Sequence, residues 1–580
     1  MAAPRMFPTS GAWRIRAVRP ADILVLLALF ALLFGLLELI PSLDSPLHSQ
    51  SSAGTSSVSL DPAEIPYYAV RSLLRMFIGL FLAVVFTFVY ATAAARLPRA
   101  EKILLPILDI LQSVPVLGFL TVIASTLVAL FPGSELGLEC SSIFAIFTAM
   151  AWNITFAFHA SLVSQPRELD EAARVMRLTK WERFWKLDVP SGMIPMIWNG
   201  MMSFGGAWFF LTASEAITIG NKRYVLPGIG SYVATAALKD DLGDIGWAIL
   251  AMIIMVVGVN FLFWRPMVAW AERFRIGDSA AVDKPRSVVL DMIRRSQVNE
   301  WLARPTRPFG RALDSATRPF GLAEHPLRKP VVRQRAGDLV FSTAVVLGVL
   351  FGVWEALSYI HRNVGFGQFG TAFGYGAVTF ARVVVVLIIS TVVWVPIAVW
   401  IGMNPRVSRL AQPIVQVAAS FPANFIYPFL MALFIALGIS LNYGGIVLML
   451  MGAQWYILFN VIAGASTVPN DLRESMQVMG VRGLLRWRVL ILPAIFPSYV
   501  TGAITAAGGA WNASIVAEFV TYDGRNITST GLGAYITEAS DAGDTAKVVL
   551  GVMVMSVYVV LVNRFFWRRL YALAERRFSQ

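Results

Sequence analysis

The sequence predicts an all-α polytopic membrane protein of about twelve transmembrane helices, arranged as two parallel six-helix repeats with both termini in the cytoplasm. Three observations predict this class: an apolar, weakly charged composition, apolar stretches of spanning length, and an internal repeat that pairs the two halves of the chain. Helices are expected because the bilayer core offers no water to backbone N–H and C=O groups, which must then be paired within the spanning segment.

The composition sets the first limit. Of the 580 residues, 57% are hydrophobic and 14% are charged, whereas soluble domains carry about 25% charged residues. The single cysteine, Cys140, excludes an intrachain disulfide and a cysteine-based metal site, and the four histidines have no metal-ligand spacing, so no metal site is expected. The net charge of +13 could suit a nucleic acid, but basic cytoplasmic loops explain it better, so no nucleic-acid partner is expected.

Apolar runs of spanning length recur along the chain. The first run follows three arginines and resembles a signal peptide, but it is long enough to span and no A-x-A cleavage site follows it. The third run of each half contains prolines, Pro106 and Pro115 in the first half and Pro413 and Pro422 in the second, which predicts a broken or kinked helix. The runs are 22–40, 70–95, 104–131, 142–163, 193–219 and 245–265 in the first half, and 337–360, 377–403, 412–438, 443–465, 495–519 and 545–566 in the second.

The distribution of Lys and Arg predicts the orientation. Segments 96–103, 164–192, 404–411 and 466–494 are basic. Of the segments on the opposite side, 41–69 and 132–141 contain no Lys or Arg, and 220–244 contains Lys222, Arg223 and Lys239. Basic loops remain in the cytoplasm, so both termini are expected there.

Segment 266–336 divides the chain into units 1–265 and 337–580. It holds 14 Lys and Arg against 7 Asp and Glu, many prolines, and the pentapeptide TRPFG twice. The segment is predicted to be a cytoplasmic linker. Two interpretations remain open, a plain tether or a partly amphipathic segment that lies on anionic lipid.

Two polar segments between apolar runs define the repeat. The first polar segment is 165–190 and the second polar segment is 468–493. The same spacing of 303 positions separates Pro166 from Pro469 and Pro190 from Pro493, and earlier in each half the spacing is 307, as between Arg75 and Arg382. An even number of helices per half makes the repeats parallel, so both polar segments are expected on one membrane face. The two halves are expected to face each other and to enclose a pathway between them.

The first polar segment is predicted to fold as helix–turn–helix. Acidic residues fill the first turns after Pro166, and Thr179 and Glu182 have the spacing of a capping box. An amphipathic loop that merely covers the bundle is one interpretation, and a docking surface for a partner is the other. Matched segments in two repeats favour docking.

At these residues the chain resembles the EAA loop of binding-protein-dependent ABC importer permeases. Glu171, Ala172 and Ala173, followed by Val189-Pro190, are similar to that loop, as are Glu474, Gly480 and the Ile491–Pro493 ending of the second polar segment. The first departs from the family pattern at Arg177, where the family has glycine, and the second at Ser475 and Met476, which replace the alanines. The resemblance implies that ATPase subunits couple at Glu171, Ala172, Ala173, Arg177, Glu474, Ser475, Met476 and Gly480, with unequal strength at the two loops.

Segments 88–93, 111–119, 531–536 and 563–571 are similar to the nitrate, sulfonate and bicarbonate branch of that family. This implies a permease subunit of the bacterial inner membrane, multi-pass and in contact with lipid, that moves a small anion by alternating access. It also implies an extracytoplasmic solute-binding protein and two ATPase subunits, identical or different. The sequence contains no Gly-Lys pair and hence no phosphate-binding loop, so the chain is not expected to be an enzyme or to hold a cofactor, and ATP and Mg²⁺ would bind the partner.

Several residues within the apolar runs are candidates for the translocation pathway. Glu215 and Glu518 could form a gate or face the solute, or be carboxylates hydrogen-bonded at the interface. Arg75 and Arg382 could snorkel outward or attract an anion. The Gly-Gly-Ala-Trp motifs that end in Trp208 and Trp511 predict close helix packing. The pathway candidates are Ser113, Pro115, Ser420, Pro422, Trp208, Trp511, Glu215 and Glu518.

One alternative is a secondary transporter with two six-helix halves, and a scaffold or channel without coupled transport is another. A secondary transporter would carry a G-x-x-x-D-R-x-G-R-R type loop after its second helix, where this chain has Arg-Leu-Pro-Arg-Ala-Glu-Lys at 96–102. Uptake that depends on an ion gradient and not on ATP would favour it.

Overall fold

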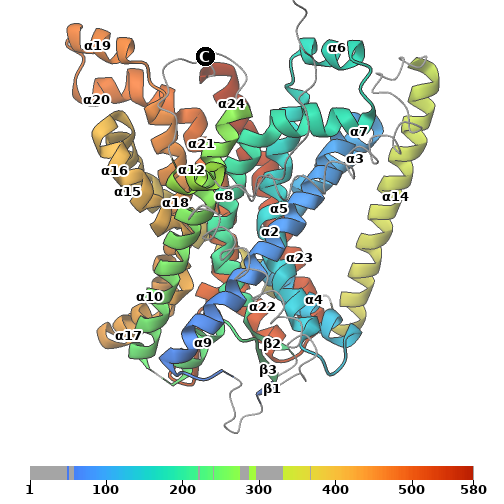
Figure 1. The fold of residues 1–580 in the computed structure, drawn as a ribbon. Coiled ribbons are helices and arrows are strands. Elements are labelled where there is room, and N and C mark those ends of the chain that lie inside the picture. Colours follow the sequence, from blue (N-terminus) through green and yellow to red (C-terminus); the bar gives the residue numbers. More distant parts are fainter. Residues whose placement is uncertain are drawn as a thin grey trace, which may run out of the picture.

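The structure is a computed structural model that describes residues 49–50, 58–219, 222–239, 241–274, 287–295, 331–365 and 367–578. The predicted first span, 22–40, and much of the predicted linker lie outside these residues. Helices make up most of the described chain, with one three-stranded and one two-stranded antiparallel sheet (Figure 1).

The first unit is a series of long helices joined by short turns. Its π-helical turns η2 (Phe184–Asp188) and η3 (Asn260–Trp264) continue directly into α-helices. The bounds are β1 (Ser49–Gln50), η1 (Pro62–Glu64), α2 (Ile65–Arg96), α3 (Pro98–Ser113), α4 (Val116–Leu130), α5 (Leu136–Val163), α6 (Arg167–Val175), α7 (Lys180–Arg183), α8 (Val189–Ser214), β2 (Ala216–Ile219), β3 (Lys222–Val225), α9 (Ile229–Leu238), α10 (Leu242–Val259), α11 (Arg265–Ala271), η4 (Glu272–Phe274) and α12 (Val288–Arg295).

The second unit repeats this order. Every element from α6 to η3 recurs 303 positions later with the same length, and α3 recurs 307 positions later, which confirms the internal repeat. The bounds are α14 (Val331–Asn363), α15 (Gly367–Met403), α16 (Pro405–Ser420), η6 (Ala423–Phe425), α17 (Tyr427–Leu437), α18 (Leu441–Ser466), α19 (Asn470–Val478), α20 (Gly483–Arg486), η7 (Trp487–Ile491), α21 (Leu492–Ala517), β4 (Phe519–Tyr522), β5 (Arg525–Thr528), α22 (Leu532–Asp541), α23 (Thr545–Val562), η8 (Asn563–Trp567) and α24 (Arg568–Phe578).

The described residues include seven helices that are long and apolar enough to cross a membrane, or eight if the bent pair α3 and α4 is one span. The chain is therefore an all-α polytopic membrane protein with two repeats. Each predicted run within the described part falls on one helix or, for the third run of each half, on two, and the helix of the fifth run ends earlier than expected in each half. Helix α8 ends at Ser214, and 216–219 form a strand, because the chain turns into a β-hairpin there.

The third run of each half is broken, as its prolines predict. Helices α3 and α4 meet at 99° around Pro115, and the second unit is interrupted at Pro422. Proline lacks an N–H group and forces the preceding residue out of helical conformation, and Val114 and Phe421 are both extended, with ψ angles of 123° and 128°.

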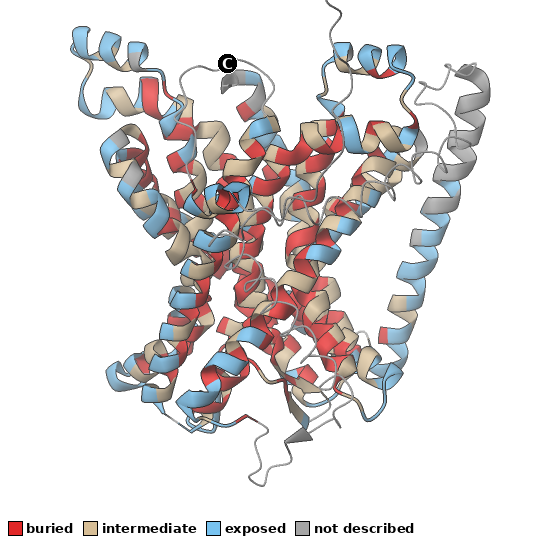
Figure 2. Cartoon of the chain, viewed as in Figure 1, coloured by how far each residue is buried: buried red, intermediate tan, exposed pale blue. Residues whose placement is uncertain are grey.

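Both polar segments lie at one end of the molecule. Helices α6 and α19 and the C-terminal helix α24 share that end, and the β-hairpins occupy the opposite end (Figure 1). Buried residues gather where the long helices cross, while α6, α19 and much of α14 are exposed (Figure 2).

The two hydrophobic cores exchange elements between the units. Val116, Leu117 and Leu120 of α4 belong to the core of the second unit. In return, Phe425 of η6 is buried in the core of the first unit, where Phe421 also packs. Each broken third run thus completes the core of the other unit, so the two units form one packed body.

Candidate functional site

The first polar segment folds as predicted, with α6, a turn, and α7 continuing through η2 into α8. The capping box is confirmed: Thr179 Oγ1 accepts from the Glu182 N–H at 3.1 Å, and the Glu182 carboxylate accepts from the Thr179 N–H at 3.0 Å. That backbone N–H, followed by the Lys186 ammonium at 2.9 Å, holds the pKa of Glu182 below its usual value. The start of α7 is therefore fixed by local hydrogen bonds.

The two polar segments are anchored by different chemistry at one matched position. In the first, Asp170 pairs with Arg183. In the second, the matched residue is Arg473, which donates to the carbonyl oxygens of Met403 at 2.9 Å and Ala465 at 3.0 Å. The sequence reasoning missed both anchors, although the 303-residue spacing marks the charge reversal.

Each polar segment presents an apolar pair at the end of its first helix. Val175 and Met176 are 85% and 71% exposed, and the matched Val478 and Met479 are 89% and 73% exposed. Exposed apolar side chains on a charged segment indicate an interaction surface.

The predicted coupling residues surround these pairs. Glu171, Ala172, Glu474 and Ser475 are exposed, Met476 is half-buried and Ala173 is buried. Ser475 donates to the carbonyl oxygen of Asp471 in its own helix. The structure therefore offers the carboxylates of Glu171 and Glu474 to a partner, at equivalent places.

Arg177 and Gly480 share a left-handed backbone conformation. Their φ angles are 49° and 69°, where a glycine is unstrained and other L-residues are disfavoured. Arg177 stands where the EAA pattern has glycine. The positive φ of this turn explains why the pattern has glycine there.

We expect Arg177→Gly to stabilise this turn by roughly 1 kcal/mol, since the left-handed conformation disfavours residues with a Cβ by about that amount. The matched change Gly480→Arg should destabilise its turn by a similar amount. Hydrogen exchange of 165–190 and 468–493 in the purified chain measures both. Faster exchange in Arg177→Gly than in the wild type would contradict the expectation.

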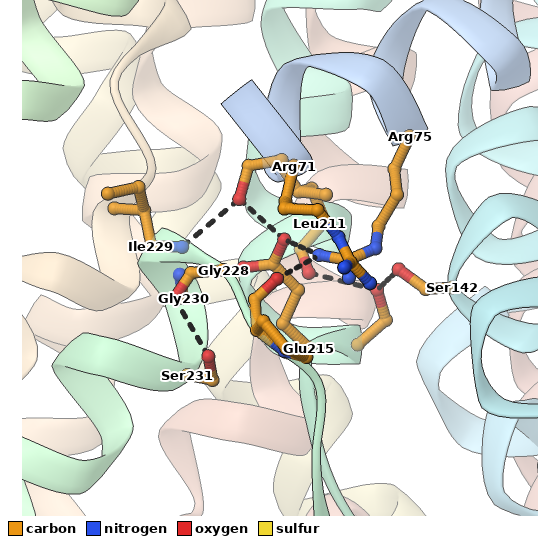
Figure 3. Close-up of polar contacts among 12 residues, drawn as sticks. Arg71, Arg75, Ser142, Leu211, Glu215, Gly228, Ile229, Gly230 and Ser231 are labelled. Atoms are coloured by element: carbon orange, nitrogen blue, oxygen red, sulfur yellow. Dashed lines mark hydrogen bonds and ion pairs between the residues drawn. The ribbon is translucent and has the colours of Figure 1, made fainter. Parts of the chain in front are cut away.

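At the opposite end, α2 carries two arginines that enter a buried ion-pair network (Figure 3). Arg75 donates through Nη1 to Glu215 at 2.6 Å and through Nε and Nη2 to Glu139, also at 2.6 Å. Arg71 donates to Glu139 at 2.7 Å, and the Ser72 hydroxyl donates to Glu215 at 2.6 Å. Two cations thus balance two carboxylates, which is the condition for holding charge in a protein interior.

The second unit contains a smaller version of the same network. Arg382 donates to Glu518 at 2.7 Å and to the side-chain oxygen of Asn442 at 3.0 Å, and Thr379 takes the place of Ser72. Where the first unit has Arg71 and Glu139, the second has Val378 and Asn442. One positive and one negative charge are missing together, so each network is neutral.

The carboxylates hold the start of the next helix. The Gly230 N–H donates to Glu215 at 2.7 Å, and the Gly533 N–H donates to Glu518 at 2.8 Å. These N–H groups lie in the first turns of α9 and α22, which have no side-chain cap of their own. A Cβ at Gly228 would lie 2.3 Å from Glu215, so only glycine admits the carboxylate there.

This geometry bears on the predicted pathway residues. Glu215 and Glu518 are 0% exposed, so in this conformation they are hydrogen-bonded interior carboxylates, and a pathway role for them stays a prediction. Arg75 and Arg382 are buried in ion pairs, so the expectation that they snorkel outward is wrong, and attraction of an anion by them stays a prediction.

The other pathway candidates lie near the contact between the units. Trp208 and Trp511 are buried in the cores, and Pro115 and Pro422 are buried at the helix breaks. Ser420 lines a small cavity beside Gly205, and for Ser113 the structure describes the backbone alone. Whether these residues line the pathway stays a prediction.

Polar contacts between the units are not two-fold symmetric. The Asn424 amide donates to Thr212 Oγ1 at 2.8 Å, and the Val116 N–H donates to Asn512 Oδ1 at 2.9 Å. The residues matched to Thr212 and Asn512 are Ile515 and Phe209, which cannot make these bonds. These contacts were not predicted, because sequence spacing does not show which residues of two repeats meet.

The Gly-Gly-Ala-Trp motifs provide a test of this contact. A Cβ at Gly205 would lie 2.7 Å from Ser420 Oγ, whereas a Cβ at the matched Gly508 would meet nothing within 4 Å. We expect Gly205→Leu to lower thermal stability and transport, by roughly 1–3 kcal/mol of overpacking, and Gly508→Leu to leave stability within about 0.5 kcal/mol. Melting curves of the two variants in detergent compare them, and equal losses would contradict the asymmetry.

Comparison with known proteins defines the class. Residues 69–275 and 394–580 each match the family described as binding-protein-dependent transport system inner membrane component. The matches cover both repeats and most of the chain, so the chain belongs to this family and is a permease subunit of an ABC importer. ATP hydrolysis takes place on separate subunits of such transporters.

Relatives with narrower descriptions each match about one unit. The nitrate import permease protein NrtB of Leptolyngbya laminosa is 24% identical over 38% of this chain and 83% of its own length. The taurine transport system permease protein TauC of Escherichia coli is 24% identical over 36% of this chain and 73% of its own length. The bicarbonate transport system permease protein CmpB of Synechococcus elongatus is 23% identical over 30% of this chain and 60% of its own length.

Proposed function

We propose that this chain supplies both permease units of an ABC importer that moves a small anion such as nitrate, a sulfonate or bicarbonate by alternating access. Units 1–265 and 337–580, joined by the linker 266–336, would provide twelve transmembrane helices with cytoplasmic termini in a bacterial inner membrane. Helix α11 extends the first unit to Ala271, so the linker would begin a few residues later than 266.

One observation carries the proposed coupling: both polar segments expose the same Val-Met pair beside the same glutamate on the same backbone. Apolar side chains of this size that are exposed in one chain are normally covered by a partner in the assembly. ATPase subunits docked there would bind both units from one side. Because both segments expose the same Val-Met pair and glutamate, we expect one kind of ATPase chain at both, while the anchors Asp170 and Arg473 would make the two arms unequally stiff.

The anion class is supported by charge balance. The intramembrane carboxylates Glu215 and Glu518 are neutralised by arginine, so they place no unpaired negative charge against an anion. The first unit also carries neutral donors, since the amide of Gln112 reaches Asn153 at 3.0 Å and that of Asn153 reaches Ser203 at 3.1 Å. The names of the relatives NrtB, TauC and CmpB agree with this class.

Further partners follow from the family. An extracytoplasmic solute-binding protein would dock at the end that carries the β-hairpins, lipid would surround the helices, and no nucleic acid is involved. No cofactor is proposed on this chain, and ATP with Mg²⁺ would bind the partner ATPase.

Reconstitution tests the proposal. The chain is reconstituted in proteoliposomes together with an ATPase and a solute-binding protein encoded beside it. ATP is supplied in the compartment that faces the ATPase. Uptake of labelled nitrate, bicarbonate or taurine is expected only with ATP and the binding protein together. Uptake driven by an ion gradient without ATP would overturn the proposal.

A further inference from the structure

A groove of about 760 Å³ runs along the outer side of α2 and ends beneath α7. Its wall is apolar and aromatic, and Phe81, Val85 and Val89 are exposed on the face of α2 that points away from the bundle. The wall residues include Phe81, Val85, Phe88, Val89, Trp181 and Trp185. In Figure 1, α7 lies close to the end of α2 that is nearest the polar segments.

The end of the groove beneath α7 is polar and has unused hydrogen-bond donors. Thr92 Oγ1 and Arg96 Nε are buried and have no hydrogen-bond partner among the described residues, and both side chains line the groove. Buried donors are normally paired, so an acceptor that the described residues do not provide is expected here.

The same end carries an unbalanced positive charge. Nearby carboxylates already have partners, since Glu182 pairs with Lys186 at 2.9 Å and Asp188 with Arg96 at 2.5 Å. Lys180 is exposed at the rim and makes no ion pair within the described part of the chain. Its charge therefore remains available to an anion.

The second unit lacks the basic and aromatic end of the groove, so this feature is not a general property of the repeat. The basic and aromatic residues are replaced at the matched positions: Met403 for Arg96, Gly483 for Lys180, Leu484 for Trp181 and Arg488 for Trp185.

We propose that this groove binds one phospholipid with an anionic headgroup. The phosphate lies beside Lys180 and accepts from Thr92 and Arg96, and an acyl chain lies along the apolar wall of α2. Tryptophans such as Trp181 and Trp185 favour the headgroup level of a bilayer, and basic side chains at the cytoplasmic surface attract anionic lipid. The lipid would join α2 to the first polar segment, giving that segment a contact that the second does not have.

The test uses the full chain in membranes that contain phosphatidylglycerol and phosphatidylcholine. A phosphatidylglycerol probe with a photoreactive acyl chain is expected to label 81–97 and 180–185, in preference to the matched 388–404 and 483–488. The ratio of phosphatidylglycerol to phosphatidylcholine retained by the purified chain is expected to fall about fivefold in Lys180→Gln. A change of about fivefold in affinity is the effect that one basic side chain has on the binding of an anionic lipid. Lys186→Gln is the matched control, because Lys186 already pairs with Glu182, and its ratio should stay at the wild-type value.

Val85→Trp fills the groove and should lower retention of both lipids. An unchanged ratio in Lys180→Gln would overturn the proposal, as would equal labelling by phosphatidylcholine and phosphatidylglycerol probes, which indicates ordinary surrounding lipid. No label at 81–97 in the wild-type chain would also overturn it. Absence of label is the result expected if the predicted span 22–40 of this chain fills the groove. This labelling test uses the wild-type chain, so it does not depend on the folding of a variant.

Discussion

Reversing the charge of Glu171 and Glu474 together is expected to abolish ATP-driven uptake, by a factor of ten or more, while the chain still inserts and folds. Both carboxylates are exposed beside the Val-Met pairs, so their replacement by arginine removes no internal contact of the described chain. Central residues of a docking surface contribute about 2 kcal/mol or more, or roughly thirtyfold in affinity, at each site. Uptake in proteoliposomes and co-purification of the ATPase measure the effect.

The matched control for Glu171→Arg with Glu474→Arg is Glu168→Gln with Asp471→Asn. It removes two exposed carboxylates from the same helices, α6 and α19, one turn earlier. Uptake near the wild-type level is expected in the control. Undiminished uptake in the arginine variant would show that these segments do not couple the ATPase to transport.

The second large effect is expected from the buried pair of Arg382 and Glu518. Arg382→Met leaves the 0% exposed Glu518 carboxylate without its cation, and removal of one partner of a buried ion pair destabilises a protein by about 3–5 kcal/mol. Adding Glu518→Gln should recover much of the loss, since the amide is neutral and its oxygen can still accept from the Gly533 N–H. The free energies of unfolding of the four proteins in mixed micelles form a double-mutant cycle.

An exposed pair provides the comparison. Lys186→Gln breaks the contact with Glu182 at the surface and should change stability by less than about 1 kcal/mol. If Arg382→Met were as stable as Lys186→Gln, the network would not brace α22 against α15 as the geometry implies.

Features that depend on local sequence were predictable. Apolar runs located the spans, Pro115 and Pro422 marked the broken helices, and Thr179 with Glu182 predicted the start of α7. The constant spacing of 303 positions identified the two polar segments as equivalent, and every element from α6 to η3 repeats at that spacing.

Features that depend on distant partners were not predictable. Arg75 and Glu215 are 140 positions apart, and a single arginine in an apolar run does not show whether lipid, water or a carboxylate will receive its charge. The change of spacing from 307 to 303 also obscured the second network, because Thr379 and Asn442 match Ser72 and Glu139 at different spacings. The hairpin of β4 and β5 did have a local signal: Asp523-Gly524 adopts the two positive φ angles, 49° and 66°, of a tight hairpin turn.

The exchange of core elements between units has a consequence for synthesis of the protein. The apolar face of α4 has no complete surroundings until the second unit exists, and the first unit waits for Phe425. At about 5–20 residues per second, the roughly 300 residues between Pro115 and Phe425 take about 15–60 s to emerge. During that interval the first unit is an unfinished intermediate in the membrane, and because both halves belong to one polypeptide, the missing piece arrives on the same ribosome.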